Sequence, residues 1–263
     1  MGFWERTWQE RADVLTLAYG ETSPADMVVS FSWTDRPLRC PGACALSFPP
    51  IQESRDPTRQ RRDDWLYVTM GLSQPLDKEQ VKHERSAGKS YSAYGIEFAF
   101  VVPIEERWPP DALYYFMTYM TEGEEICWGD RFPFRFYRKG NDGLSVQTGS
   151  PSTVSPVGSI RAVLFWPFLF PDWEFLTSTG KFMIMVATGI TEREWEAAKR
   201  TTSAHLLLLL CRAGIAQRTL PERECLFADP RWSEEWAGIE RMSPDGCQTE
   251  IESGIGRWHL NEA

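Results

Sequence analysis

The sequence lacks the segments that direct a chain into or across a membrane. Its longest apolar run, residues 206–211, is far shorter than the roughly 20 residues that a transmembrane helix needs. The first 20 residues contain neither a basic leader nor an unbroken apolar stretch, so no secretory signal is visible. These absences predict a soluble, cytoplasmic protein without a membrane partner.

Cysteine and histidine are also scarce, with six and three residues in a chain of 263. The cysteines do not have the density of a secreted disulfide scaffold, and we therefore expect six free thiols. Cys40 and Cys44 form the one close pair in the sequence. A zinc site would also need a second pair or histidines at ligand spacing, and His83, His205 and His259 are isolated. We expect no metal site and no cofactor.

Motifs of the common enzyme classes are missing as well. The sequence has no Walker lysine loop, no GxSxG motif and no HExxH motif. Glu124, Glu125 and Asp130 could pair as acid and base, but this spacing beside a glycine is more typical of a solvated turn. We predict that the protein is not an enzyme, and an uncharacterised enzyme remains only a third alternative.

The charge of the chain is acidic and unevenly distributed. A formal net charge of −9 without a clustered basic face argues against nucleic acid as a partner. Residues 222–263 hold ten acidic and four basic side chains, so this acidic C-terminal segment contributes −6 of the total. It either forms a solvated face or attracts a basic protein partner.

Hydrophobic periodicity predicts an α+β protein that forms a single domain over residues 1–263. Strand and helix patterns alternate without βαβ regularity and without internal repeats. Helices are expected at 4–18, 108–120, 191–199 and about 203–212, and strands at 27–33, 43–50, 65–70, 94–103, within 127–140, at 159–168 and at 180–190. The segments 51–64 and 171–180 are interpreted as polar breaks.

Three residues are assigned structural roles. Gly71 ends the alternating strand 65–70. Glu97 is a carboxylate within an apolar strand, which more often belongs to a hydrogen-bonded structure than to a general base. Thr191 and Glu194 have the spacing of a capping box, which predicts a helix start.

The segment after Asp130 predicts a strand at the edge of a sheet. Three phenylalanines would occupy one face, whereas Arg131, Pro133 and Arg135 would occupy the other. A proline within a strand favours an edge position or a bulge. An edge strand with an arginine-bearing outer face could accept a strand from a protein partner.

Six short sequence motifs resemble those of the Suppressor of fused-like domain in their order and approximate spacing. They are WLYVTMGLS, YGIEFAFVVP, WPPDALYYFMTYM, CWGDRF, FMIMVATGITEREWEAA and DPRWSEEWAGIE followed by PDG. Each motif is unspecific by itself, but with all six in order the similarity extends from about residue 8 to about residue 247. The chain is therefore identified as similar to this family over nearly its whole length.

The resemblance implies a mixed, largely antiparallel β-sheet flanked by helices, as in the N-terminal domain of Suppressor of fused, and a non-enzymatic binding role. The animal namesake grips an extended peptide of transcription factors between this domain and a second one, whereas we expect the present chain to contain only the first. In that family the peptide groove contains the aspartate of a glycine–aspartate–histidine motif. Here the corresponding residues are Gly129, Asp130 and Arg131, so the resemblance implies a groove residue only at Asp130.

Single-domain relatives are mostly bacterial, and many are thought to be immunity proteins encoded beside toxins. The resemblance thus implies an immunity protein that neutralises a basic toxin, since opposite surface potentials favour selective encounter. The alternative is a general protein- or peptide-binding module that sequesters a partner. Two surfaces compete as the binding site: the predicted edge with Asp130, Arg131 and Arg135, and the acidic segment with Glu234, Glu235 and Glu240.

Overall fold

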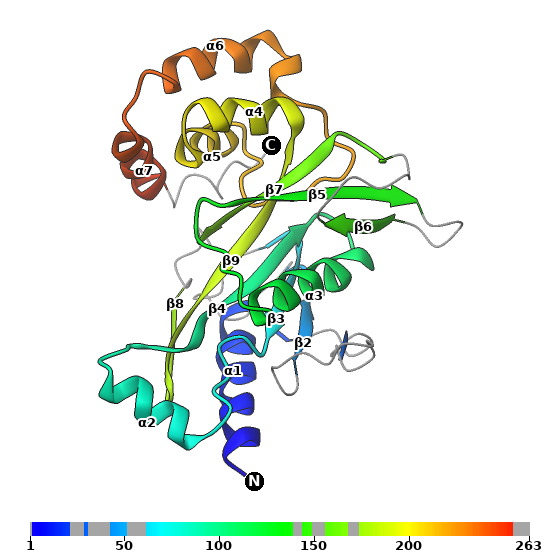
Figure 1. Ribbon diagram of the computed structural model, residues 1–263. Helices are drawn as coiled ribbons and strands as arrows, with labels where there is room; N and C mark the ends of the chain where they lie inside the picture. The colour runs from blue at the N-terminus through cyan, green and yellow to red at the C-terminus, as the bar shows by residue number, and fades with distance from the viewer. Residues whose placement is uncertain are drawn as a thin grey trace. The chain divides into compact units, whose positions relative to one another are not determined.

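A computed structural model describes the chain at residues 2–21, 29–30, 43–51, 62–138, 144–148, 156–167 and 174–254 (Figure 1). Two compact units share these residues, and each is described by itself. The first unit comprises residues 1–125 and 172–185, and the second comprises 126–171 and 186–263. The prediction of a single domain over 1–263 stays a prediction.

The first unit contains an antiparallel sheet. Its strands are β1 (Val29–Ser30), β2 (Cys44–Phe48), β3 (Trp65–Met70), β4 (Tyr91–Val102), β8 (Glu174–Thr177) and the first half of β9 (Gly180–Thr191). Hydrogen bonds join neighbours in the order β1, β2, β3, β4, β9, and β8 forms a hairpin with β9. Both faces of β3 are buried, as its alternating apolar pattern predicts.

Three helices accompany this sheet. They are α1 (Phe3–Tyr19), α2 (Lys78–Ser86) and α3 (Trp108–Thr121). Helix α3 packs against β2, β3 and β4, and α1 contacts β8 (Figure 1). Sequence patterns predicted α1 and α3, but the short polar helix α2 was missed, although Asp77 caps it by accepting a hydrogen bond from the Gln80 amide.

Arg11 lies on the buried face of α1 and is only 1% exposed. Its Nε donates to Ser73 Oγ over 3.1 Å, and its Nη1 donates to the Thr7 carbonyl over 2.9 Å. Its Nη2 donates to the Ser73 carbonyl, to Ser92 Oγ and to Thr179 Oγ1 at 2.6, 3.0 and 2.8 Å. One guanidinium therefore ties α1 to the segment after β3, to β4 and to the β8–β9 hairpin.

Glu97, the carboxylate predicted to be structural, is fully buried on β4. It accepts hydrogen bonds from Thr69 Oγ1 at 2.6 Å, from the Gly71 amide at 3.1 Å, and from the amide and hydroxyl of Ser73 at 2.8 and 2.7 Å. Burial raises the pKa of Glu97, while these donors oppose the rise. Ser73 contacts both side chains and so brings the Glu97 carboxylate next to Arg11. Burial lowers the pKa of Arg11, and the negative charge of Glu97 opposes this lowering. These contacts favour a structural role for Glu97.

Gly71 is held in a conformation that side chains rarely adopt, with φ at +136°. An added Cβ would lie 3.0 Å from the Ala43 Cα and 3.3 Å from the Met117 Cε. We expect Gly71→Ala to lower the free energy of unfolding by about 1–3 kcal/mol, because backbone strain and crowding act together. Urea denaturation followed by tryptophan fluorescence measures the change.

Gly238 provides the matched control for this substitution. It lies in helix α6 (Pro230–Ile239), and nothing stands within 4 Å of an added Cβ. Gly238→Ala should raise the free energy of unfolding by about 0.5–1 kcal/mol, because alanine loses less backbone entropy in a helix. Equal unfolding midpoints for both variants would refute the assignment of strain to Gly71.

The second unit contains the second half of β9 together with β7 (Ile160–Pro167), β5 (Arg131–Arg138) and β6 (Leu144–Thr148), which are neighbours in that order. The prediction that 131–138 is an edge strand is wrong. Residues 131–133 of β5 pair with β7, and 134–138 pair with β6. Pro133 is tolerated although β5 lies between two strands, because β6 pairs only from Phe134 onward.

Helices α4 (Glu192–Arg200), α5 (Ser203–Arg212), α6 and α7 (Pro244–Ser253) complete this unit. The five leucines of α5 are fully buried, as predicted, in a core cluster that includes residues of β7, α4, α6 and α7. The predicted capping box is confirmed: the Thr191 hydroxyl accepts from the Glu194 amide, and the Glu194 carboxylate accepts from the Thr191 amide at 2.9 Å. Helix α4 therefore begins where the sequence pattern places it.

Glu194 also forms a buried ion pair with Arg223 and is 0% exposed. Arg223 Nη1 donates to Glu194 Oε1 over 2.7 Å, and Nη2 donates to Oε2. The Leu226 amide supplies a further donor at 2.9 Å. Burial raises the pKa of Glu194, but the hydrogen bonds and charge of Arg223 outweigh this effect, so the pKa lies below its ordinary value.

The predicted class, α+β with a largely antiparallel sheet and flanking helices, is confirmed. The pairs β1–β2, β2–β3, β3–β4, β5–β6, β5–β7 and β8–β9 are all antiparallel. The interpretation of 171–180 as a polar break is wrong, since β8 and the start of β9 form a hairpin there. Strand β6 and helices α6 and α7 were not predicted. Much of the expected strand 27–33 and most of the loop 51–64 lie outside the described residues.

Two sequence predictions about absent features can be compared with the described residues. Five cysteines there are free, and burial raises the pKa of two of them, Cys44 and Cys211, to about 12. Cys40 lies outside the described residues, so the prediction of six free thiols stays a prediction. Within the described part, no group of histidine, cysteine, aspartate or glutamate is suited to a metal ion, and no helix is long and apolar enough to span a membrane.

Candidate protein-binding site

A tight turn in the second unit carries Asp130, the residue that the family resemblance places at a binding groove. Asp130 is exposed, and its Oδ2 accepts a hydrogen bond from the Cys127 amide at 2.7 Å. The Asp130 amide donates back to the Cys127 carbonyl over 3.1 Å. Gly129 lies between them with φ at +83°, a value that glycine adopts without strain. One carboxylate oxygen thus stabilises the turn rather than waiting for a ligand.

The same turn is fixed to its neighbours in the second unit. The Gly129 amide donates to the Phe165 carbonyl over 2.7 Å, and the Phe165 amide donates to the Asp130 carbonyl over 2.9 Å. The hydroxyl of Ser203, at the start of α5, donates to the Gly129 carbonyl. Strand β7 and helix α5 therefore hold the turn rigidly, which is the preorganisation that a binding surface needs.

Two stacked indole rings flank this turn. Trp128 is 59% exposed, and its ring lies 6.0 Å from that of Trp166 with an interplanar angle of 29°. Exposed tryptophan that rests on a second ring loses little entropy on binding and supplies a large apolar contact area. The sequence patterns did not predict a role for either ring. The available signal was the position of Trp128, which directly precedes the Gly129–Asp130 motif.

Arg131 and Arg135 follow the turn on β5, four residues apart and thus on one face of the strand. Both side chains are half-buried instead of fully projecting. The Arg131 Nη1 is buried and has no hydrogen-bond partner among the described residues. A buried guanidinium donor without an acceptor costs free energy, so this atom is suited to an oxygen supplied by a ligand.

The acidic residues proposed as a competing site are on helix α6. Glu234 and Glu240 are exposed, and Glu240 directly follows the last residue of α6, Ile239. Glu235 is half-buried and pairs with Arg212, which also binds Glu250 at 2.6 Å. Because Arg212 pairs with Glu235, one of these three carboxylates, the charge available to a partner on this helix is smaller than the sequence suggests.

The predicted site residues therefore fall into two separate sets within the second unit. Asp130 and Arg131 adjoin the Trp128–Trp166 pair, so we call Trp128, Asp130, Arg131 and Trp166 the tryptophan surface. Apolar rings, a carboxylate oxygen and an unused guanidinium donor are the chemistry of a protein-binding hot spot.

The chain matches the sequence model of one protein family, described as Suppressor of fused protein, over residues 45–224. Among curated protein sequences, none matches the chain. Solved structures with the same fold include that of the Sufu-Fu complex, at 18% identity and a TM-score of 0.58, where the match covers 90% of this chain and 98% of the other.

Two further solved structures are similar. Drosophila Suppressor of Fused matches at 18% identity with a TM-score of 0.58, covering 88% of this chain and 54% of the other. A Suppressor of fused homologue from Neisseria gonorrhoeae matches at 16% identity with a TM-score of 0.51, covering 84% of this chain and 97% of the other. These likenesses confirm the fold that the sequence resemblance implies.

Proposed function

Because the chain belongs to the Suppressor of fused protein family, we propose that it is a non-enzymatic protein-binding domain that holds its partner at the tryptophan surface. One observation carries this proposal: an exposed tryptophan, stacked on a second ring, lies in a rigid turn beside a buried arginine donor without an acceptor. Truncated hot-spot residues of this kind typically cost a complex about 2 kcal/mol or more.

We further propose that the partner is a toxin, which the protein neutralises as an immunity protein. The net charge of −9 supports a basic partner, because complementary potentials accelerate association. The alternative is a general regulatory module that sequesters an extended peptide. In either case a partner strand cannot add to residues 134–138 on the side of β6, because β6 already pairs with that part of β5.

The test measures association and dissociation rates with the protein encoded by the neighbouring gene, at two salt concentrations. Trp128→Ala should weaken binding by at least about tenfold, or 1.4 kcal/mol, mainly through faster dissociation. The matched control is Leu17→Ala, which removes another exposed apolar side chain, 68% exposed, from the first unit. The control should bind as the unchanged protein does.

The acidic helix makes the opposite forecast in the same experiment. If Glu234 and Glu240 attract the partner, replacing both with glutamine should slow association and flatten its salt dependence, whereas Trp128→Ala should have little effect. That outcome would move the binding site to α6. If the neighbouring protein does not bind at all, the toxin proposal is wrong, and a peptide library becomes the test of the general module.

A further inference from the structure

Strand register places the side chain of Arg131 beside the ring of Trp166. Arg131 is the direct partner of Leu164 in the pairing of β5 with β7, so these two side chains point to the same face of the sheet. Trp166 lies two positions beyond Leu164 on β7 and therefore shares that face. Diagonal neighbours of this kind are within reach of long side chains, so the Arg131 guanidinium can contact a group that lies on the indole rings.

Burial turns this guanidinium into an incomplete site. Leu164 is fully buried in the core cluster that includes α5, and Arg131 is half-buried next to it. The Arg131 Nη1 is itself buried, and no acceptor for it exists among the described residues. A donor that has lost its water without gaining an acceptor is unfavourable until an acceptor arrives. A ligand that brings an oxygen to Nη1 would therefore gain more than it does at an exposed arginine.

The start of α5 has the same sign of charge as Arg131. The Ser203 hydroxyl donates to the Gly129 carbonyl, which joins the first residue of α5 to the turn. An added Cβ on Gly129 would lie 3.8 Å from both Ser203 Cβ and Trp166 Cζ3, so the helix start and the indole ring converge there. The side chain of Thr202 does not cap this helix, and free amides at a helix start favour an anion. The helix start alone would select nothing, but it strengthens the preference that Arg131 sets.

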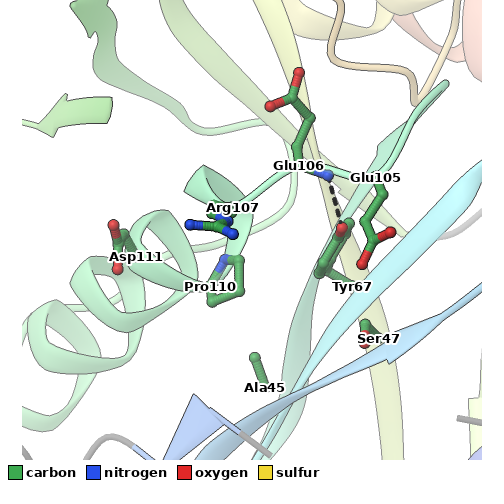
Figure 2. A pocket seen from close by; sticks show the side chains of 8 residues that line it. All are labelled: Ala45, Ser47, Tyr67, Glu105, Glu106, Arg107, Pro110 and Asp111. Atoms are coloured by element: carbon green, nitrogen blue, oxygen red, sulfur yellow. Dashed lines mark hydrogen bonds between the residues drawn. The ribbon is translucent and has the colours of Figure 1, made fainter. Parts of the chain in front are cut away.

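The pocket of about 470 Å³ in the first unit differs from this surface. Residues of β2, β3 and the start of α3 line it, and the Tyr67 hydroxyl accepts a hydrogen bond from the Glu106 amide at 2.9 Å (Figure 2). Its acidic residues, Glu105, Glu106 and Asp111, each interact with other groups of the protein. Their charge therefore does not indicate a ligand, and the pocket is the comparison site for the experiment below.

We propose that the tryptophan surface binds a carboxylate side chain of the partner, next to an apolar residue that covers Trp128. Carboxylate oxygens accept short, charge-assisted hydrogen bonds from guanidinium, so a carboxylate satisfies Arg131 Nη1 better than a neutral carbonyl does. The apolar neighbour packs on the exposed Trp128 ring, as in other hot spots. This binding mode rests on the proposed function and names the group by which the partner is recognised.

A local carboxylate contact is compatible with a basic partner. The net charge of each protein governs their attraction at long range, whereas single charged contacts fix the register of the complex and exclude wrong partners. An acidic chain that uses one arginine at its contact surface can therefore attract many basic proteins but retain only those with a carboxylate at the matching position.

The test compares two peptide probes, N-acetylleucylglutamate amide and N-acetylleucylglutamine amide, by chemical-shift titration of the full chain at neutral pH. The probes have nearly the same shape and differ by one negative charge. The glutamate probe should shift the indole N–H signals of Trp128 and Trp166 and the amide of Gly129 in a saturable way. It should bind at least about fivefold tighter than the glutamine probe.

Other results of this titration would overturn the proposal. They are equal affinities for the two probes, shifts that do not saturate, and shifts at Ser47 and Tyr67, which would place the probe in the pocket of Figure 2. Both probes are titrated into the unchanged protein, so no variant has to fold for this comparison.

Variants then connect the preference to Arg131. In Arg131→Met the two probes should bind equally to within about twofold, because the charged donor is gone. Arg138→Met is the matched control: it removes the same charge from the other end of β5, where the Arg138 side chain is 71% exposed, and should keep the preference for glutamate. Loss of the preference in both variants would mean that general charge attraction, and not Arg131, selects the carboxylate.

The free protein gives a readout that a merely structural arginine would not give. Arg131→Met removes an unsatisfied buried donor, so this variant should unfold at the same or a higher urea concentration than the unchanged protein. A lower midpoint would show that Arg131 is needed for the fold and would overturn its assignment to a ligand.

The outcomes also separate this inference from the proposed function. If Trp128→Ala weakens the complex with the partner but the glutamate probe is not preferred, the surface is the binding site and only the carboxylate is wrong. If Trp128→Ala leaves partner binding unchanged, the proposed site is wrong and the carboxylate assignment fails with it.

Discussion

Replacing Arg223 with methionine should lower the free energy of unfolding at neutral pH by about 3–5 kcal/mol, because the change leaves a buried carboxylate without its counter-ion. The Glu194 side chain is 0% exposed, and Arg223 provides two of its hydrogen bonds. The backbone amides of Thr191 and Leu226 remain as donors but carry no full charge. Urea denaturation followed by fluorescence measures the loss.

The same pair gives the protein a dependence on acid. Because the pKa of Glu194 in the folded state is below its unfolded value, the pair contributes stability above the unfolded pKa of about 4.3. That contribution is lost as the pH falls through the lower folded value. In Arg223→Met the carboxylate loses the charge and the hydrogen bonds of Arg223, which oppose the effect of burial on its pKa, so the difference in stability between the two proteins should shrink in acid.

Two controls distinguish a buried charge from a simple loss of contacts. The double variant Arg223→Met with Glu194→Met should recover much of the stability, since no ion then remains unpaired. Removing an exposed ion pair by Lys82→Ala should cost at most about 1 kcal/mol, because Lys82 and Glu79 are mostly in solvent. Equal free energies of unfolding for the single variants Arg223→Met and Lys82→Ala would contradict the conclusion that Arg223 neutralises a buried charge.

Glu97→Ala is expected to be the second severe substitution, with a loss of about 3–5 kcal/mol. It removes the acceptor of four hydrogen bonds from Thr69, Gly71 and Ser73, and it leaves the buried Arg11 without its neighbouring carboxylate. Each buried donor that stays unsatisfied costs about 1–3 kcal/mol. Thermal unfolding followed by circular dichroism measures the effect.

A milder substitution separates shape from charge at this position. Glu97→Gln keeps one oxygen for the amides of Gly71 and Ser73 but turns the other atom into a donor facing Thr69. We expect it to lie between Glu97→Ala and the unchanged protein in stability. If Glu97→Ala melted as the unchanged protein does but lost partner binding, Glu97 would be a functional residue and its structural assignment would be wrong.

Local signals in the sequence were sufficient for the elements that depend on nearest neighbours. The capping box of Thr191 and Glu194, the two-sided strand β3 and the leucine-rich α5 all have patterns that packing reinforces. Signals for α6 and α7 were present and overlooked, since Asp229 and Ser243 each precede a proline at the first helical position. Strand β8 was missed because its hairpin turn, Ser178 and Thr179, lacks glycine and asparagine.

The candidate sites depended on contacts that no local pattern carries. Pro133 suggested that its strand lies at the edge of the sheet. The three-dimensional structure shows instead that β5 pairs with both β7 and β6. Trp128 and Trp166 lie 38 positions apart in the sequence, and nothing there indicates that their rings stack.

The interleaving of the two units restricts how this gene can be divided or recombined. A break after residue 125 does not separate them, because residues 172–185 belong to the first unit. The resulting N-terminal fragment would lack Thr179, an acceptor of the buried Arg11, and both strands of the β8–β9 hairpin. Transfer of one unit between homologous genes thus requires crossovers at three positions, because a single crossover leaves at least one unit with segments from both parents.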